Sequence, residues 1–428
     1  MRRTTTAILS FVVFILMLGL GASPSQASPI YVRLTTIDVP ASVDNSVGGK
    51  FATYDIAYFD GTTQLMYLAD RSNASVDIFS AKTNTFVGRI GGSGHLFVGQ
   101  QASNDTSGPD GVVVANFGTS KQLWAGDGPS LLKGFDLNTP GFPQLANTPI
   151  NTGANPPTRV DEMAFDPRDK LLLVANNAAD PPFATLVDTT TNSIVPKGKI
   201  TFDGTNADGH NAPKATNGIE QSVWDPSHGG RFFISIPELN GSGPGGVAMI
   251  DPLTGNVTKV YDLTVLSGGT ITSCSPAGLA LGVGGKLMVG CGNGGTQSVL
   301  LDPNANNGNG SIKTFAQVSG EDMVWFDPTT DRYFLAARLN QSGPVLGIID
   351  GLTETFLQNV RTTPGDHSVA VDPVSGEVFV PFGGIAGNTV CPNGCVAVFI
   401  TPEPGSLLLL GAGLIGLGGL GWRRRRRA

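Results

Sequence analysis

One short phrase of apolar runs and turns recurs seven times along this 428-residue chain. Each copy has short runs rich in Val, Ile, Leu and Phe, which favour β-strands, separated by turns rich in Gly, Asn, Thr or Asp-Pro. Clear copies read EMAFDPRDKLLLVAN (162–176), SVWDPSHGGRFFISI (222–236) and MVWFDPTTDRYFLAA (323–337). The copies lie about 45 to 60 residues apart, in the range of propeller blades. This pattern predicts an all-β fold, a seven-bladed β-propeller.

The turns between the runs carry a recurring chemistry. Asp at the first position of a type I turn accepts a local backbone hydrogen bond, and Pro presets φ at the second position. At the first turn, Asp-Pro stands in four of the copies, at 166–167, 225–226, 327–328 and 372–373. The copy near 111–148 is the most degenerate. A pair of β-sandwiches is the alternative fold, but seven similar four-stranded units favour the propeller.

The seventh copy ends after three strands, because CVAVFI (395–400) is its last apolar run. A further strand is available at the other end of the body, in IYVRLTTIDV (30–39). We expect this N-terminal strand to complete the seventh blade and close the ring. Closure removes the open sheet edges that would otherwise invite aggregation. With its V-x-x-ID…TG-x-V strand pairs, the body resembles YVTN-type and NHL-like propellers over nearly all of 30–400, which implies the fold and says little about function.

Short and long loops are expected on opposite faces of this ring. In a four-stranded blade the A–B and C–D turns share one face, and here they are short. The B–C and D–A connections share the other face and contain the long segments, such as 91–109 and 203–218. Long loops on a rigid scaffold are the usual place for binding, so we expect any ligand on that face.

Four cysteines in an exported chain favour two disulfides. Cys274 precedes an inner strand and Cys291 ends its hairpin partner, whereas Cys391 and Cys395 flank one short loop. We expect these two pairs to staple the long-loop face. Paired C-x-x-C motifs are absent from the sequence, which argues against zinc. Two histidines and two aromatic residues also fall in or near loops: His95, His210, Phe97 and Trp124. We expect the histidines to be exposed bystanders. The two aromatics are candidate contacts for a ligand.

Alignment of the copies on their first turn produces a column of polar residues beside the central channel. The column contains Asp55, Asp161, Glu220, Asp322 and His367, with Asp110 within one residue of it. A ring of oxygen ligands there would suit Ca²⁺ or another divalent cation. Some gluconolactonase-like and lyase propellers work in this way, so the column would suit a metal-assisted enzyme. The alternative is that each acid accepts backbone N–H groups at the entry to its blade.

The N-terminus has the three parts of a secretory signal peptide: Arg2 and Arg3, an apolar run to Leu20, and a small-residue cleavage site at Ala27. An uncleaved membrane anchor is the alternative interpretation. Seven of the 27 basic residues and one of the 34 acids lie outside 28–400, so this body has 20 basic and 33 acidic residues. Such an acidic body repels nucleic acid, and we expect no nucleic-acid partner.

The C-terminus reads TPEPGSLLLLGAGLIGLGGLGWRRRRRA. Residues 406–422 form an apolar segment at the short end for a transmembrane helix, and the arginines behind it would stay in the cytoplasm. This apolar segment is preceded by Pro402, Glu403 and Pro404 and followed by Arg423, Arg424, Arg425, Arg426 and Arg427. This order closely resembles the PEP-CTERM sorting signal at 401–428. The resemblance implies a Gram-negative host, an exosortase as partner, a transient hold in the inner membrane, and an exopolysaccharide or biofilm matrix as destination.

Two functions are consistent with these observations. The first is a surface-displayed propeller, with a body at 28–400, that binds polysaccharide, matrix proteins or small molecules without catalysis. The alternative is a metal-dependent lactonase or lyase that uses the channel carboxylates. The sequence has no G-x-S-x-G nucleophile elbow, no H-E-x-x-H and no Walker A loop. Few aromatics are available on its loops, and no catalytic motif is present, which favours binding.

Overall fold

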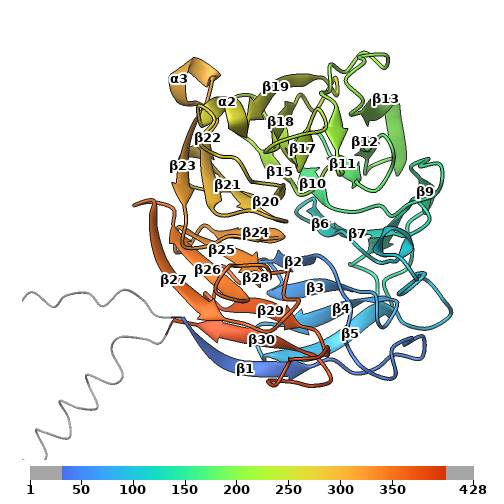
Figure 1. The fold of residues 1–428 in the computed structure, drawn as a ribbon. Coiled ribbons are helices and arrows are strands. Elements are labelled where there is room, and N and C mark those ends of the chain that lie inside the picture. The colour runs from blue at the N-terminus through green and yellow to red at the C-terminus, as the bar shows by residue number, and fades with distance from the viewer. Residues whose placement is uncertain (1–30, 402–428) are drawn as a thin grey trace, which may run out of the picture. The chain divides into compact units, whose positions relative to one another are not determined.

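The computed structural model describes residues 31–401. Within them Tyr31–Ile400 form one compact unit of seven four-stranded antiparallel sheets, which follow one another around a ring (Figure 1). The expected all-β, seven-bladed propeller is therefore confirmed. Every strand of the seven sheets lies inside this unit, so it contains all the strand pairings that the ring needs.

The blades are numbered in chain order, and each is given from its inner strand A to its outer strand D. Blades one and two contain β2 (Ala57–Asp60), β3 (Leu65–Asp70), β4 (Ser75–Ser80), β5 (Thr85–Gly91), and β6 (Val112–Asn116), β7 (Lys121–Asp127), β8 (Leu131–Asp136), β9 (Ile150–Asn151). Blades three and four contain β10 (Met163–Asp166), β11 (Leu171–Asn176), β12 (Phe183–Asp188), β13 (Ser193–Thr201), and β15 (Ser222–Asp225), β16 (Arg231–Ile236), β18 (Gly246–Ile250), β19 (Val257–Asp262). Blades five and six contain β20 (Pro276–Leu281), β21 (Leu287–Cys291), β22 (Ser298–Asp302), β23 (Ser311–Phe315), and β24 (Met323–Asp327), β25 (Arg332–Ala337), β26 (Val345–Asp350), β27 (Thr355–Arg361).

Blade seven is assembled from both ends of the unit. It contains β28 (Ala370–Val371), β29 (Val378–Phe382), β30 (Cys395–Ile400) and, as its outer strand, β1 (Val32–Asp38). The register of β1 against β30 runs from Val32 opposite Ile400 to Asp38 opposite Cys395. The predicted closure by the N-terminal strand is confirmed, and Figure 1 shows the blue and red ends of the unit side by side.

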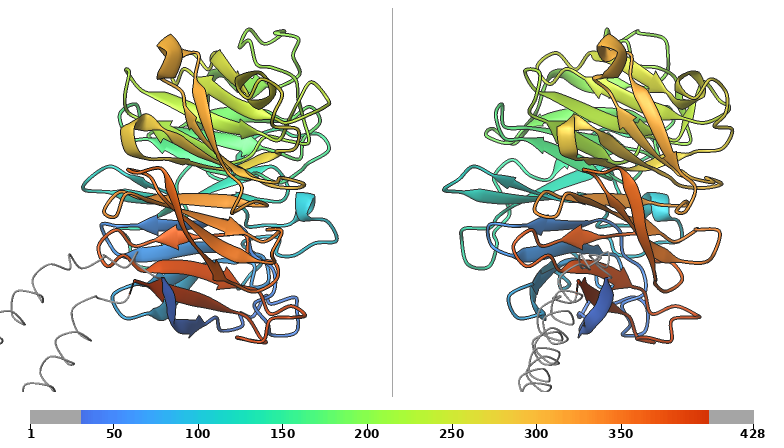
Figure 2. Two further views of the ribbon diagram at one scale, coloured as in Figure 1. Left: turned by 60° about the vertical axis from the view of Figure 1, so that its left-hand side comes forward. Right: turned by 90° about the vertical axis from the view of Figure 1, so that its left-hand side faces the viewer.

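The connections contain the few remaining elements of the described chain. β14 (Ala215–Thr216) and β17 (Glu238–Leu239) pair outside the blades, and single helical turns occur at η1 (Asn104–Thr106), α2 (Leu263–Leu266), η2 (Val283–Gly285) and α3 (Ala305–Gly308). In the turned views of Figure 2 the cyan turn η1 stands out from one side of the ring. Some of these elements lie in long connections, such as η1 between β5 and β6, whereas η2 and α3 lie in the short turns of blade five.

In the four blades with Asp-Pro after the inner strand, the turn is held by the Asp that the sequence pattern selects. Asp166 Oδ1 accepts the backbone N–H of Arg168 at 2.8 Å, and Asp225 Oδ1 accepts that of Ser227 at 2.8 Å. The equivalent bonds of Asp327 and Asp372 measure 3.0 and 2.9 Å. Because the Asp side chain satisfies a backbone donor locally, the same turn forms in blade after blade.

The core lies between neighbouring blades. One buried cluster joins blades three and four through Leu173, Leu186 and Phe232, and another joins blades seven and one through Phe379 and Met66. Burial of one such side chain contributes about 1.5–3 kcal/mol. Apolar side chains packed between neighbouring blades thus hold the ring together.

The expectations for the two ends of the chain lie outside the described residues. These are the signal peptide 1–27 with cleavage at Ala27, the transmembrane helix 406–422, and the residues of the sorting signal. Between residues 31 and 401 no helix has the length and hydropathy needed to cross a membrane.

Candidate functional site

A large cavity opens on the long-loop face of the described structure. We call it the mouth cavity; its volume is about 1190 Å³. Its wall includes residues that precede the inner strands, such as Asp161 and Asp322, and residues that follow the second strands, such as Asn177 and Gly292. Residues next to every inner strand but that of blade two contribute to the wall, and η1 lines it before blade two. The cavity therefore lies on the face where long loops were expected.

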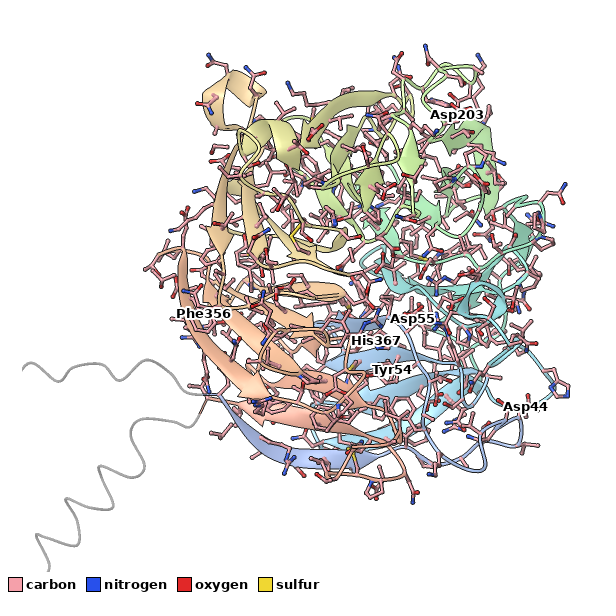
Figure 3. The ribbon with its side chains drawn as sticks, viewed as in Figure 1. Asp44, Tyr54, Asp55, Asp203, Phe356 and His367 are labelled. Carbon is pink, nitrogen blue, oxygen red and sulfur yellow. A yellow bond between two sulfur atoms is a disulfide. The ribbon has the colours of Figure 1, made fainter. Side chains whose placement is uncertain are left out.

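Five members of the predicted polar column line the mouth cavity. They are Asp55, Asp161, Glu220, Asp322 and His367. The sixth, Asp110, is fully buried and does not line the cavity. Figure 3 shows Asp55 and His367 close together toward the centre of the ring, whereas Asp44, Asp203 and Phe356 lie at its periphery. The alignment of the copies thus placed one side chain per blade correctly in most blades.

Guanidinium groups neutralise one side of this column. Arg71 Nε donates to Asp110 Oδ1 at 2.6 Å, and its Nη2 also pairs with Asp55. Arg159 Nη2 lies 2.8 Å from Asp161 Oδ2, and its Nη1 lies 3.7 Å from Asp55 Oδ2. Across the cavity, Arg338 Nη2 lies 2.9 Å from Asp322 Oδ2. The carboxylates of Asp55 and Asp161 are therefore held by arginine rather than by the expected backbone N–H groups.

His367 is fixed in the cavity wall by stacking and by backbone oxygens. Its ring stacks on Tyr54 at 4.6 Å between centroids, and the two planes differ by 6°. Nδ1 lies 2.6 Å from the carbonyl oxygen of Gly365, and Nε2 lies 3.2 Å from that of Tyr54. The Tyr54 hydroxyl in turn donates to the carbonyl oxygen of Pro381 at 2.7 Å. These contacts fix the imidazole in the wall, where its Nε2 lies 3.6 Å from Asp55 Oδ1.

The acids of the cavity titrate over a wide range. Burial acts to raise the pKa of Asp55, but Arg71, a hydrogen bond with His367, and Arg159 outweigh it and hold that pKa below its usual value. Burial raises the pKa of Asp161 to about 6, although Arg159 acts to lower it. Burial, followed by repulsion from neighbouring carboxylates, raises the pKa of Glu162 and Glu220 well above the usual range. Neighbouring acids thus occupy different protonation states at one pH.

Sequence reasoning missed the arginines and Glu162. Arg71 and Arg338 each follow the last residue of a second strand, β3 and β25. Alignment of the copies at that position would have found this pair. Glu162 is 5% exposed, lines the mouth cavity, and has an Oε2 atom without a hydrogen-bond partner among the described residues. Alignment of the copies did not select Glu162, because Asp161, the residue before it, occupies the column position in blade three.

The described residues contain no group of three His, Cys, Asp or Glu side chains placed to hold a metal ion. Asp55 and Asp161 face guanidinium groups, which compete with a cation for the same oxygens. Asp322 also faces a guanidinium group, that of Arg338. The prediction of Ca²⁺ or another divalent cation in this column stays a prediction.

Both expected disulfides are present, Cys274–Cys291 and Cys391–Cys395, with Cα atoms 4.6 and 6.0 Å apart. The prediction for His210 was wrong, because this side chain is 4% exposed and packs beside Gly255. Phe97 and Trp124 are also buried and cannot serve as surface contacts. Their burial follows from packing between blades one and two and within blade two, which loop position alone does not reveal.

Comparisons with known proteins bear on both parts of the chain. The PEP-CTERM protein-sorting motif matches residues 401–426. No curated protein matches the sequence. Among solved structures, Kuenenia stuttgartiensis hydrazine synthase has a similar fold, with a TM-score of 0.59 and 13% identity over 83% of this chain and 97% of that chain. At this identity the similarity concerns the fold alone. The chain thus joins a seven-bladed β-propeller to a PEP-CTERM sorting motif, which implies export and recognition by an exosortase.

Proposed function

We propose that this protein is an exported propeller that binds a component of the extracellular matrix in its mouth cavity. In this proposal a Gram-negative host removes residues 1–27, and the tail 401–428 holds the protein in the inner membrane through a helix and an arginine cluster. An exosortase then passes the body, residues 28–400, to the cell surface or matrix. The observation that carries the export step is the sorting motif at 401–426.

The binding step rests on the mouth cavity. Its volume, about 1190 Å³, exceeds the 300–1,000 Å³ or so that accommodates drug-sized ligands, so it has room for part of a polymer. Its wall contains both carboxylates and guanidinium groups, such as those of Asp322 and Arg338, and both groups form strong hydrogen bonds with hydroxyl-rich ligands. A matrix polysaccharide fits this chemistry better than an apolar ligand does. Exopolysaccharide is therefore the proposed ligand, with matrix proteins as the other outcome of the test.

The test applies residues 28–400 to arrays of bacterial polysaccharides and matrix proteins. Arg338→Gln removes one guanidinium from a wall position where the side chain is 35% exposed, so the cost in stability is small. We expect it to weaken binding about tenfold, which corresponds to one lost charged hydrogen bond. Arg33→Gln, on the exposed side of β1, is the matched control and leaves binding unchanged. Absence of any array ligand, or equal binding by Arg338→Gln, would contradict the proposal.

The metal-dependent lactonase or lyase is the second candidate. The observation that favours it is the convergence of acids with displaced pKa values in one cavity, which is typical of catalytic sites. Elemental analysis of residues 28–400, beside an Asp161→Ala, Asp322→Ala variant, tests it. One equivalent of calcium or a transition metal that the variant loses would support this candidate and justify a screen of lactone and lyase substrates. Metal-free protein that is inactive on those substrates with added Ca²⁺ would exclude it.

A further inference from the structure

A second cavity continues inward from the mouth cavity along the axis of the ring. It has a volume of about 520 Å³ and is lined by the inner strands β2, β6, β10, β15, β20 and β24. We call it the channel. Two residues, Ile56 and Glu162, line both the channel and the mouth cavity, so the two spaces meet there. The proposed function uses the mouth cavity and assigns no role to the channel.

The wall of the channel is mainly apolar and contains aromatic rings that remain partly exposed. These rings belong to Tyr58, Phe165, Trp224, Trp325 and Phe326. Tyr58 of blade one and Trp325 of blade six come from blades that are not neighbours, yet they meet edge to face at 5.6 Å. Exposed aromatic surface inside a channel loses contact with water when a ligand covers it, so this wall favours an apolar molecule.

The polar groups of the channel divide into those already bonded and those without partners. Gln221 Oε1 accepts the backbone N–H groups of Leu279 and Val324 at 2.8 and 3.2 Å, and its amide nitrogen donates to Val324 O. Gln221 is therefore part of the wall. Ser222 Oγ and Glu162 Oε2 have no hydrogen-bond partner among residues 31–401, although each side chain is only 5% exposed. A buried polar atom of this kind is satisfied by water or by a ligand.

Glu162 stands at the junction with negative groups around it. Burial first, and then repulsion from the nearby acids Glu220, Asp161, Asp322 and Asp55, raises the pKa of its carboxyl well above the usual range, so the carboxyl favours its protonated form. Of the nearby cations, Arg159 is held by Asp161, and Arg71 and Arg338 are held by other acids. A cationic group beside Glu162 would relieve this repulsion and supply the missing hydrogen-bond donor.

We propose that the channel binds the apolar body of an elongated small molecule whose primary ammonium group lies beside Glu162, at the junction with the mouth cavity. The volume of the channel is in the range of drug-sized ligand sites, about 300–1,000 Å³. The apolar wall recognises the body of the ligand, and the group of acids at the junction recognises its charge. Hydrophobic amines are the class of ligand that meets both conditions.

The experiment uses three matched probes with residues 28–400: 4-phenylbutylamine, the neutral 4-phenylbutanol, and butylamine, which lacks the ring. Trp224 and Trp325 line the channel, so quenching of tryptophan fluorescence reports its occupancy, and calorimetry confirms the stoichiometry. We expect 4-phenylbutylamine to saturate one site at concentrations below about 10 mM. The alcohol and butylamine should each bind about tenfold more weakly, because each lacks one of the two recognised features.

Glu162→Gln keeps the size of the side chain and removes the carboxyl group, which in the wild-type protein can give up its proton to pair with an ammonium group. We expect this variant to bind the amine and the alcohol equally. Asp38→Asn, which removes one exposed acid on β1, is the control and should keep the wild-type preference. If Glu162→Gln does not fold, the amine-to-alcohol ratio of the wild-type protein still decides the question.

Three outcomes would overturn the proposal. They are no saturable binding of 4-phenylbutylamine, equal binding of the amine and the alcohol by wild-type protein, and equal binding of butylamine. The last outcome would mean that the acids bind amines without the channel. None of these results depends on polysaccharide binding, so failure here is distinguishable from failure of the proposed function.

Discussion

Two buried acids of the mouth cavity, Asp55 and Glu321, differ in how burial affects their charge. Asp55 keeps its charge because Arg71 pairs with it, so its pKa is held below the usual value. Glu321 has no such partner; burial raises its pKa to about 7, although hydrogen bonds from Ser298 and from the backbone N–H of Cys291 act to lower it. Residues close together in one wall therefore make opposite contributions to the pH dependence of stability.

The contribution of Glu321 has a definite sign. Between pH 4.5 and about 7 the unfolded chain has lost this proton while the folded protein keeps it, so stability falls as the pH rises. The stabilisation is complete below pH 4.5 and is lost, by about 3 kcal/mol, by the time the pH passes 7. The Glu321→Gln variant has a side chain of the same shape that does not titrate. We expect urea denaturation of wild type relative to this variant to show a decrease of that size between pH 4.5 and pH 8. If the difference in the free energy of unfolding between wild type and Glu321→Gln stays the same across this pH range, the raised pKa of Glu321 is contradicted.

The single blade is the unit that repeats, and its stability depends on turns and cross-links as well as on strands. The Asp at the end of each inner strand binds the backbone two residues later in blades one, three, four, six and seven. Blade five has Gly282 there and uses the turn η2 instead. It is also the blade whose hairpin β20–β21 is closed by the disulfide Cys274–Cys291. In blade five a covalent bond therefore accompanies an atypical turn.

The two disulfides should differ in what they contribute. Cys274 and Cys291 are separated by 17 residues, whereas Cys391 and Cys395 are separated by 4. By the loop-entropy relation the first pair contributes about 3 kcal/mol and the second about 2 kcal/mol. We expect paired Cys→Ala substitutions to lower the free energy of unfolding in that order, measured by denaturant titration without reductant. The opposite order would show that the loop 383–395 depends on its disulfide for native packing rather than for chain entropy.

At the scale of the whole molecule, the ring is closed by non-covalent pairing of one strand. Most side chains of β1 are exposed, and Ile37 is the one that is buried. The strand nevertheless pairs with β30 over its length, from Val32 opposite Ile400 to Asp38 opposite Cys395. Its main role is therefore to cover the edge of β30, which would otherwise be open to pairing with another molecule.

Deletion of residues 28–39 tests this role. We expect the shortened body to form oligomers, because the free edge of β30 can pair between molecules, whereas the intact body stays a monomer at the same concentration. A synthetic peptide of residues 30–39, added during refolding, should restore the monomer by supplying the strand in trans. Size-exclusion chromatography with light scattering measures both effects, and a scrambled peptide is the control. A shortened body that remains monomeric without peptide would show that closure is dispensable.

The sequence by itself determined the number of blades, the closing strand, the disulfide pairs and the position around the central opening of five of the six polar residues in the predicted column, which line the mouth cavity. These are consequences of local signals, namely strand runs and Asp turns, repeated in one register. Only the tertiary structure decided how those polar residues are neutralised. Arg71 meets Asp110 and Arg159 approaches Asp55 across different blades, and such contacts depend on the curvature of the ring. Local patterns carry no information about which side chains a closed ring brings face to face, so the arginines, the position of Glu162 and the apolar channel could be found only in the folded protein.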